Sequence, residues 1–291
     1  MMHRNAAKTL VALATALTAS GAVLAQTAPA APAAPAPAET SPLTANISLT
    51  TNYKFRGQDQ DTIGHNGLYK SGGVKPAIQG GFDYAFGDSG WYVGNWNSSV
   101  GWQAGNSIEM DLYGGYKMKA GVFDLDFGAY TYLYPGNHNG NTTELYAAAT
   151  YTSEQIGAFT LKYSGTVSRD YFGYAGASLG SGLSGRGTGY LNLSYAKEIM
   201  PKLTFKAAVG YTAMSSDIRR LGYKSYVDYN VGLSYDFGGG LSLAGSVQGA
   251  DHQSAYLAVV NPGVNFGFGP IGVQTQSINK AQFIATLTKT F

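Results

Sequence analysis

Along most of the chain, apolar and polar residues alternate with a period of two, in segments of about ten to fifteen residues bounded by Gly, Asn or Asp. Successive side chains of a β-strand point to opposite faces, so each segment predicts a strand with one apolar and one polar face. In one segment Leu112 and Met118 fall on the first face, and Glu109 and Asp111 on the second. The pattern predicts about twelve strands, at residues 46–58, 74–86, 90–102, 107–119, 122–134, 144–153, 159–167, 189–198, 203–214, 223–237, 241–250 and 282–291.

The connections between these segments alternate in length. Short turns are predicted at residues 87–90, 120–121, 154–158, 199–202 and 238–240, and mostly longer loops at 57–73, 103–106, 135–142, 169–187, 215–222 and 251–279. An even number of strands with loops sorted in this way is typical of an outer-membrane barrel. The predicted fold is therefore all-β, a transmembrane antiparallel up-and-down β-barrel with short periplasmic turns and long extracellular loops. A secreted β-sandwich has no reason to sort its loops by length.

The last predicted strand ends on Phe291, on the same face as Phe283 and Leu287. Backbone groups in hydrocarbon need partners within the protein, so we expect this strand to pair with the first one and close the barrel. An amphipathic strand with a terminal aromatic residue also resembles the signal that barrel-assembly machinery recognises, which makes Phe291 the expected assembly signal. Lys289 departs from that signal, since it lies on the same face.

The N-terminal region predicts export. Arg4 and Lys8 precede a short apolar run, and the small residues Val23 and Ala25 precede a cleavage site. Residues 1–25 are thus expected to be a cleaved signal peptide, with an uncleaved anchor as the alternative. The stretch after it is rich in Ala and Pro and cannot build a core. The domains are then residues 1–25, a periplasmic tail at 26–45, which could also serve as a Pro-rich ligand for a partner, and the barrel at 46–291.

The amino-acid composition narrows the range of possible functions further. Charged residues make up only 12% of the chain, which has 22 Tyr and 40 Gly, as suits strands that face lipid with aromatic residues at the interface. Cleavage of the signal peptide removes two of the 19 basic residues and none of the 17 acidic residues, so the charge is balanced and no nucleic-acid partner is expected. The chain has no Cys, which excludes disulfides and thiolate chemistry. No cofactor or metal is predicted.

Several stretches resemble the TorF-type porins, a family of Gram-negative proteins. The resemblance implies an outer-membrane β-barrel that passes solutes, with no settled substrate. It is carried mainly by the first half of the barrel, at residues 50–58, 76–86, 90–96, 108–116 and 130–146.

The polar faces of the strands supply the candidate site. A barrel of this size encloses a narrow lumen or a plug, so inward charges are expected to line or constrict a pore. Lys54 and Arg56 are the first candidates, because they lie just below the long first loop; the alternative is that they pair with Glu109, Asp111 or Glu144. The pore-lining candidates are Lys54, Arg56, Lys75, Asp83, Glu109, Asp111, Lys162, Lys206 and Asp228, and the lumen aromatics are Tyr130, Tyr132, Tyr134 and Tyr146. Trp91, Trp96 and Trp102 are expected in the interfacial girdles.

These observations predict a porin of the cell outer membrane that passes small hydrophilic solutes by passive diffusion through a narrow charged lumen. Its expected partners are outer-membrane lipid, barrel-assembly machinery and small solutes or ions, and no enzymatic activity is expected. A first alternative is a closed barrel that acts as a surface adhesin or receptor through residues 251–279. A second is a barrel enzyme acting on envelope lipid through His252, with Asp251 and Ser254; loop neighbours rarely reach the geometry of a catalytic triad.

Overall fold

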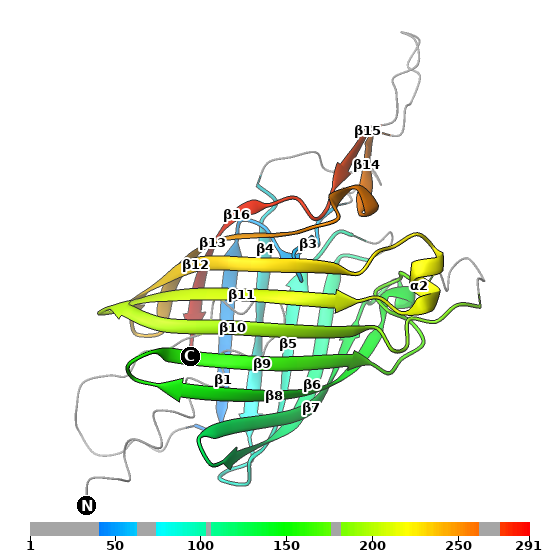
Figure 1. Cartoon of the computed structure of the whole chain (residues 1–291). Coiled ribbons are helices and arrows are strands. Elements are labelled where there is room, and N and C mark those ends of the chain that lie inside the picture. The colour runs from blue at the N-terminus through cyan, green and yellow to red at the C-terminus, as the bar shows by residue number, and fades with distance from the viewer. Residues whose placement is uncertain (1–40, 63–73, 103–105, 176–181, 262–273) are drawn as a thin grey trace, which may run out of the picture.

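The computed structural model describes residues 41–62, 74–102, 106–175, 182–261 and 274–291. Twelve antiparallel strands form one closed barrel, in which β1 pairs with β4 on one side and with β16 on the other (Figure 1). This confirms the predicted fold. The barrel strands are β1 (Leu43–Thr50), β4 (Ala77–Ala85), β5 (Trp91–Ser99), β6 (Ile108–Ala120), β7 (Phe123–Leu133), β8 (Thr142–Ser153), β9 (Gly157–Thr166), β10 (Gly189–Met200), β11 (Leu203–Ala213), β12 (Tyr226–Gly238), β13 (Leu241–Ala250) and β16 (Gln282–Thr290).

The remaining elements lie in the connections. They are β2 (Lys54–Phe55), β3 (Gln58–Asp59), β14 (Leu257–Asn261), β15 (Gln274–Ser277), the helix α2 (Ser216–Arg220) and the 3₁₀ turns η2 (His138–Gly140) and η4 (Gln253–Ala255). Figure 1 shows β14, β15 and α2 at one end of the barrel and the C-terminus at the other. In the described part of the chain, no helix has the length and apolar character needed to cross a membrane.

The barrel presents apolar side chains outward and polar ones inward, the reverse of a water-soluble protein. Every barrel strand supplies its backbone partners to a neighbour, so the closed sheet leaves no edge in contact with lipid. Exposed outward residues include Leu49, Phe82, Leu112, Phe127, Leu145, Leu161, Leu193, Val209, Val231, Leu243 and Leu287, whereas buried inward ones include Ser48, Gln79, Asp111, Asp126, Glu144, Thr160, Ser194, Lys206, Ser234, Ser246 and Thr288. This arrangement is the alternation expected of a transmembrane barrel.

The first strand is shorter than predicted. The alternating pattern predicts one strand over residues 46–58, with Tyr53 and Phe55 facing outward, but β1 ends at Thr50. The chain then turns inward, and β2 and β3 pair as a small antiparallel hairpin. Tyr53 and Phe55 are buried, with 3% and 6% of their surface exposed. We call residues 51–62 the inner hairpin.

Two of the three tryptophans also lie elsewhere than predicted. Trp91 faces outward and is exposed, but Trp96 is buried inside the barrel, where its ring contacts Tyr53 at a centroid distance of 5.5 Å. Trp102 is partly buried against Tyr134. The assignment of Trp96 and Trp102 to an interfacial girdle is therefore wrong. These two rings instead pack with the aromatic residues that fill the lumen.

Candidate functional site

The inner hairpin crosses the lumen, and its turn explains how it fits there. Arg56 and Gly57 are the two residues between β2 and β3, and both have positive φ angles, +48° and +75°. Two-residue hairpin turns of type I′ require this conformation at both positions. A Cβ atom on Gly57 would lie 2.5 Å from the carbonyl oxygen of Gly249 on β13. Only glycine therefore fits where the turn meets the wall at β13.

Arg56 is anchored to the opposite wall by a buried ion pair. Its Nη1 and Nη2 atoms lie 3.0 and 2.6 Å from the two carboxylate oxygens of Glu144 on β8, and both side chains are almost completely buried. The guanidinium also lies 4.1 Å from the centroid of the Tyr190 ring and donates to the Tyr171 hydroxyl. Burial by itself lowers the pKa of Arg56, but the charge and hydrogen bond of Glu144 together with Tyr171 and Tyr132 outweigh this effect and raise that pKa, so Arg56 stays protonated.

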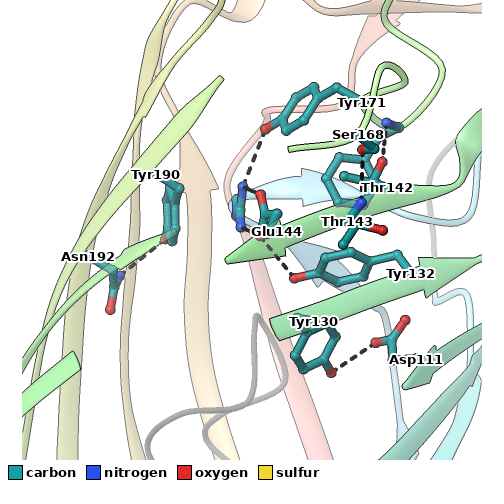
Figure 2. A network of polar contacts seen from close by, with 12 residues as sticks. Asp111, Tyr130, Tyr132, Thr142, Thr143, Glu144, Ser168, Tyr171, Tyr190 and Asn192 are labelled. Carbon is teal, nitrogen blue, oxygen red and sulfur yellow. Dashed lines mark hydrogen bonds and ion pairs between the residues drawn. The ribbon is translucent and has the colours of Figure 1, made fainter. Parts of the chain in front are cut away.

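Figure 2 shows tyrosines around this ion pair: the Tyr132 hydroxyl donates to Glu144, and the Tyr171 hydroxyl accepts from Arg56. The loop after β9 contributes Tyr171 and the neighbouring Phe172, whose backbone N–H donates to the Thr142 hydroxyl at 2.8 Å. Sequence reasoning placed this loop outside the barrel. Its cluster of aromatic residues at positions 171–174 was the available signal that it packs inward.

Two acidic residues of β6, Glu109 and Asp111, accept hydrogen bonds from tyrosine hydroxyls. Tyr53 of the inner hairpin donates to Glu109 at 2.8 Å, and Tyr134 donates to its other oxygen. Tyr130 donates to Asp111 at 3.0 Å, and the second carboxylate oxygen of Asp111 has no hydrogen-bond partner. The structure places all four predicted lumen aromatics on the inner side of the wall, namely Tyr130, Tyr132, Tyr134 and Tyr146.

Nearer the short turns, charged and aromatic side chains alternate around the lumen. Tyr92 donates to Asp126 at 2.7 Å, and the Lys117 Nζ atom lies 4.5 Å from the Tyr92 ring centroid. Lys162 makes a similar contact with Tyr146, at 4.1 Å. Of the remaining pore-lining candidates, Asp83 accepts from Tyr113 at 2.7 Å, and Lys206 is buried on β11. Asp228 lies at the other end of the barrel, at the start of β12, and accepts from Tyr190 at 3.1 Å.

The predicted basic residues at the base of the inner hairpin are also held by polar contacts. Lys54 donates to the carbonyl oxygens of Gly57 and Ile278, at 3.2 and 2.8 Å. Lys75 forms an ion pair of 2.7 Å with Asp59, a residue that sequence reasoning did not single out. The described structure thus gathers Lys54, Arg56 and Lys75 around one inward segment.

Lys54 lies in the inner hairpin, outside the membrane-spanning strands, and its burial predicts a pH dependence. Burial lowers the pKa of Lys54 to about 8, with Asp59 opposing and Lys75 reinforcing the shift. Above that pH the folded chain loses a proton that the unfolded chain keeps until about pH 10.5, so the free energy of unfolding should rise with pH in this window, by about 3 kcal/mol.

Denaturant unfolding of the folded chain in detergent micelles at several pH values measures this effect. The Lys54→Met variant should show a rise smaller by this amount, and a Lys280→Met variant, which changes an exposed lysine, should keep the full rise. Parallel curves for all three proteins would contradict the assigned role of Lys54.

Comparisons with known proteins relate the chain to one family and one kind of fold. The family model described as "Bacterial protein of unknown function (Gcw_chp)" matches residues 33–291. Among solved structures, the chain is similar to the KdgM porin, with 11% identity, a TM-score of 0.51, and coverage of 85% of this chain and 99% of that one. It is similar to the NanC porin, with 13% identity, the same TM-score, and coverage of 86% and 98%.

No curated protein sequence matches the chain. The TorF-type name is carried by none of these matches and remains a resemblance. At such low identities the solved structures support the fold alone, which is that of an outer-membrane porin. The chain belongs to the Gcw_chp family of bacterial proteins, and it folds as a twelve-stranded barrel of the porin type.

Proposed function

We propose that this protein is an outer-membrane porin that passes small hydrophilic solutes by passive diffusion through a narrow charged lumen. One observation carries the proposal: a closed barrel with an apolar outer surface holds buried acidic, basic and hydroxyl side chains on its inner wall. Charged groups lining a barrel interior favour water and hydrophilic solutes over lipid. The porin folds of KdgM and NanC agree with this assignment.

The inner hairpin is the proposed constriction. It contributes Lys54 and Arg56 to the lumen, and Arg56 reaches Glu144 on the wall across from β1. This contact is the ion pairing that the sequence left open as an alternative to a free constriction charge. In the proposal the inner hairpin is both ion-paired and the constriction. A segment fixed by ion pairs narrows the lumen, and its charged residues still determine the charge at the narrowest point.

The proposed location and orientation of the protein follow from the apolar outer surface of the barrel. The apolar belt meets outer-membrane lipid, the short turns face the periplasm and the long connections face outward. Phe291 is highly exposed at the end of β16, at the end of the barrel with the short turns. We therefore keep Phe291 as the proposed signal for barrel-assembly machinery, and the N-terminal segment as the proposed export signal.

Single-channel recordings of the refolded chain in a planar bilayer test the proposal. Steady conductance is expected, and Lys54→Ala and Arg56→Ala should each shift the reversal potential under a salt gradient toward cation preference. Each change removes a positive charge beside the acidic residues of the lumen. The control is Lys202→Ala, which changes an exposed residue in a short turn. An unchanged reversal potential in both variants would remove these residues from the constriction.

A second candidate function, a surface receptor built on a closed barrel, is favoured by the aromatic cluster in the lumen. Tyr53, Phe55, Tyr132, Tyr171 and Phe172 are all buried around the inner hairpin. A folded, inserted chain that passes no current would favour the receptor over the porin. The enzyme alternative has weaker support, because His252 lies 3.9 Å from Asp251 and both side chains are largely exposed.

A further inference from the structure

A pocket of about 340 Å³ lies above the inner hairpin, at the end of the barrel with the long connections. Ligand sites for small molecules usually begin at about 300 Å³ and combine an apolar lining with a few polar groups. The lining comes from the inner hairpin and from four separate connections of the barrel, and its residues include Phe55, Gln58, Gln60, Trp102, Tyr174 and Tyr223. The fold thus brings distant segments together around one cavity.

Aromatic residues form nearly half of the pocket lining that the structure describes. Seven of its fifteen lining residues are Phe, Trp or Tyr. Tyr174 contacts Tyr223 edge to face at a centroid distance of 4.7 Å, and Tyr256 packs behind Tyr223 at 5.8 Å. Because these rings support one another, the wall offers fixed apolar faces to a ligand. Tyr223 is only partly buried, so its ring remains accessible.

Neutral polar groups of the inner hairpin form the floor. Gln58 is held by the Tyr174 hydroxyl, which donates to it at 2.7 Å, and it donates in turn to Asn279 at 3.1 Å. Gln60 donates to the Gln58 carbonyl through Nε2, which leaves its own side-chain oxygen as an acceptor. The Thr62 hydroxyl completes the row. An aliphatic ligand would leave the Gln60 side-chain oxygen and the Thr62 hydroxyl without partners, at an energetic cost.

The charge around the pocket is balanced. Among the described residues, Asp59 is the only carboxylate that lines it, and Lys75 neutralises this group at 2.7 Å, with both side chains almost completely buried. The described part of the lining contains no Lys, Arg or His. A charged ligand would therefore lose its hydration without gaining a countercharge. These features select an uncharged ligand.

We propose that this pocket binds an uncharged saccharide. A pyranose ring has an apolar face of C–H groups and a rim of hydroxyls, which matches aromatic walls above a floor of amides and hydroxyls. The Trp102 indole N–H is a buried donor without a hydrogen-bond partner in the described structure, and its ring lines the same pocket. The site is independent of whether the barrel conducts.

Saturation-transfer NMR with the refolded chain in detergent micelles tests the proposal, with maltose, cellobiose and lactose as neutral probes and galacturonate as the charged one. We expect at least one of the neutral disaccharides to bind and galacturonate to bind more weakly. Tyr223→Leu should weaken binding about tenfold, because it removes an aromatic face. Tyr211→Leu, which changes an exposed residue on the outer wall, is the matched control.

Three outcomes would overturn the saccharide site: no neutral probe binds, galacturonate binds best, or the two tyrosine variants bind alike. Circular dichroism of each variant establishes that it is folded. Because the measurement uses no current, a failure here is separate from a failure of the porin proposal.

Discussion

Replacing residues 52–60 by a Gly/Ser segment of equal length is expected to raise the single-channel conductance several-fold. The replacement removes the buried rings of Tyr53 and Phe55 and breaks the ion pair between Arg56 and Glu144. A Gly/Ser segment has neither apolar side chains to bury nor a charge to pair, so it gains little from staying in the lumen and should leave it. The barrel strands keep their partners, because β1 ends at Thr50.

The same replacement at residues 135–139 is the control, since these residues form a mostly exposed connection at the same end of the barrel. It should leave conductance unchanged. If the hairpin replacement also left conductance unchanged in a folded chain, the inner hairpin would not be the constriction. Salt-gradient measurements on both proteins would then show which part of the lumen selects ions.

Replacing Glu144 by Gln is expected to lower the free energy of unfolding by about 3–5 kcal/mol. Glu144 is the only carboxylate that the described structure pairs with Arg56, and both side chains are almost completely buried. The variant would therefore keep a buried guanidinium without its countercharge, and the contacts with the Tyr190 ring and the Tyr171 hydroxyl would offset only part of its desolvation. Denaturant unfolding in micelles measures the loss.

Two further variants separate the ion pair from other effects of the substitution. Glu154→Gln changes an exposed residue in a short turn and should have almost no effect. The double variant with Arg56→Met and Glu144→Leu removes both charges and should recover much of the lost stability, because no buried charge remains unpaired. A single variant as stable as the wild type would contradict the structural role of the pair.

The sequence predicted the wall of the barrel better than its interior. Alternation is a local signal, so it located the strands and the sorted loops. It failed after Thr50 because Thr51, Tyr53 and Phe55 continue the same alternation into the inner hairpin. The turn at Arg56–Gly57 lacks the Asn-Gly or Asp-Gly pair that usually marks such hairpins.

The prediction for Trp96 was wrong for a related reason. Trp91 and Val93 lie on one face and Trp96 on the other, so apolar residues occur on both sides and the pattern does not say which meets lipid. The inward orientation of the tyrosines was easier to predict, because they share a face with acidic neighbours such as Asp126. The ion-pair partners could not be predicted from the sequence, because Arg56 and Glu144 are separated by 88 residues and meet only in the folded barrel.

The inner hairpin also imposes an order on the way the chain folds. Its Lys54 is held by Ile278, 224 residues later, and its Gln58 by Asn279, 221 residues later. Contacts between such distant segments form slowly, because a long loop must close before they contribute. The aromatic residues of the inner hairpin should therefore stay exposed during folding until β16 has formed. Closure of the barrel and enclosure of its contents are then one late event, so a chain halted before β16 would lack both.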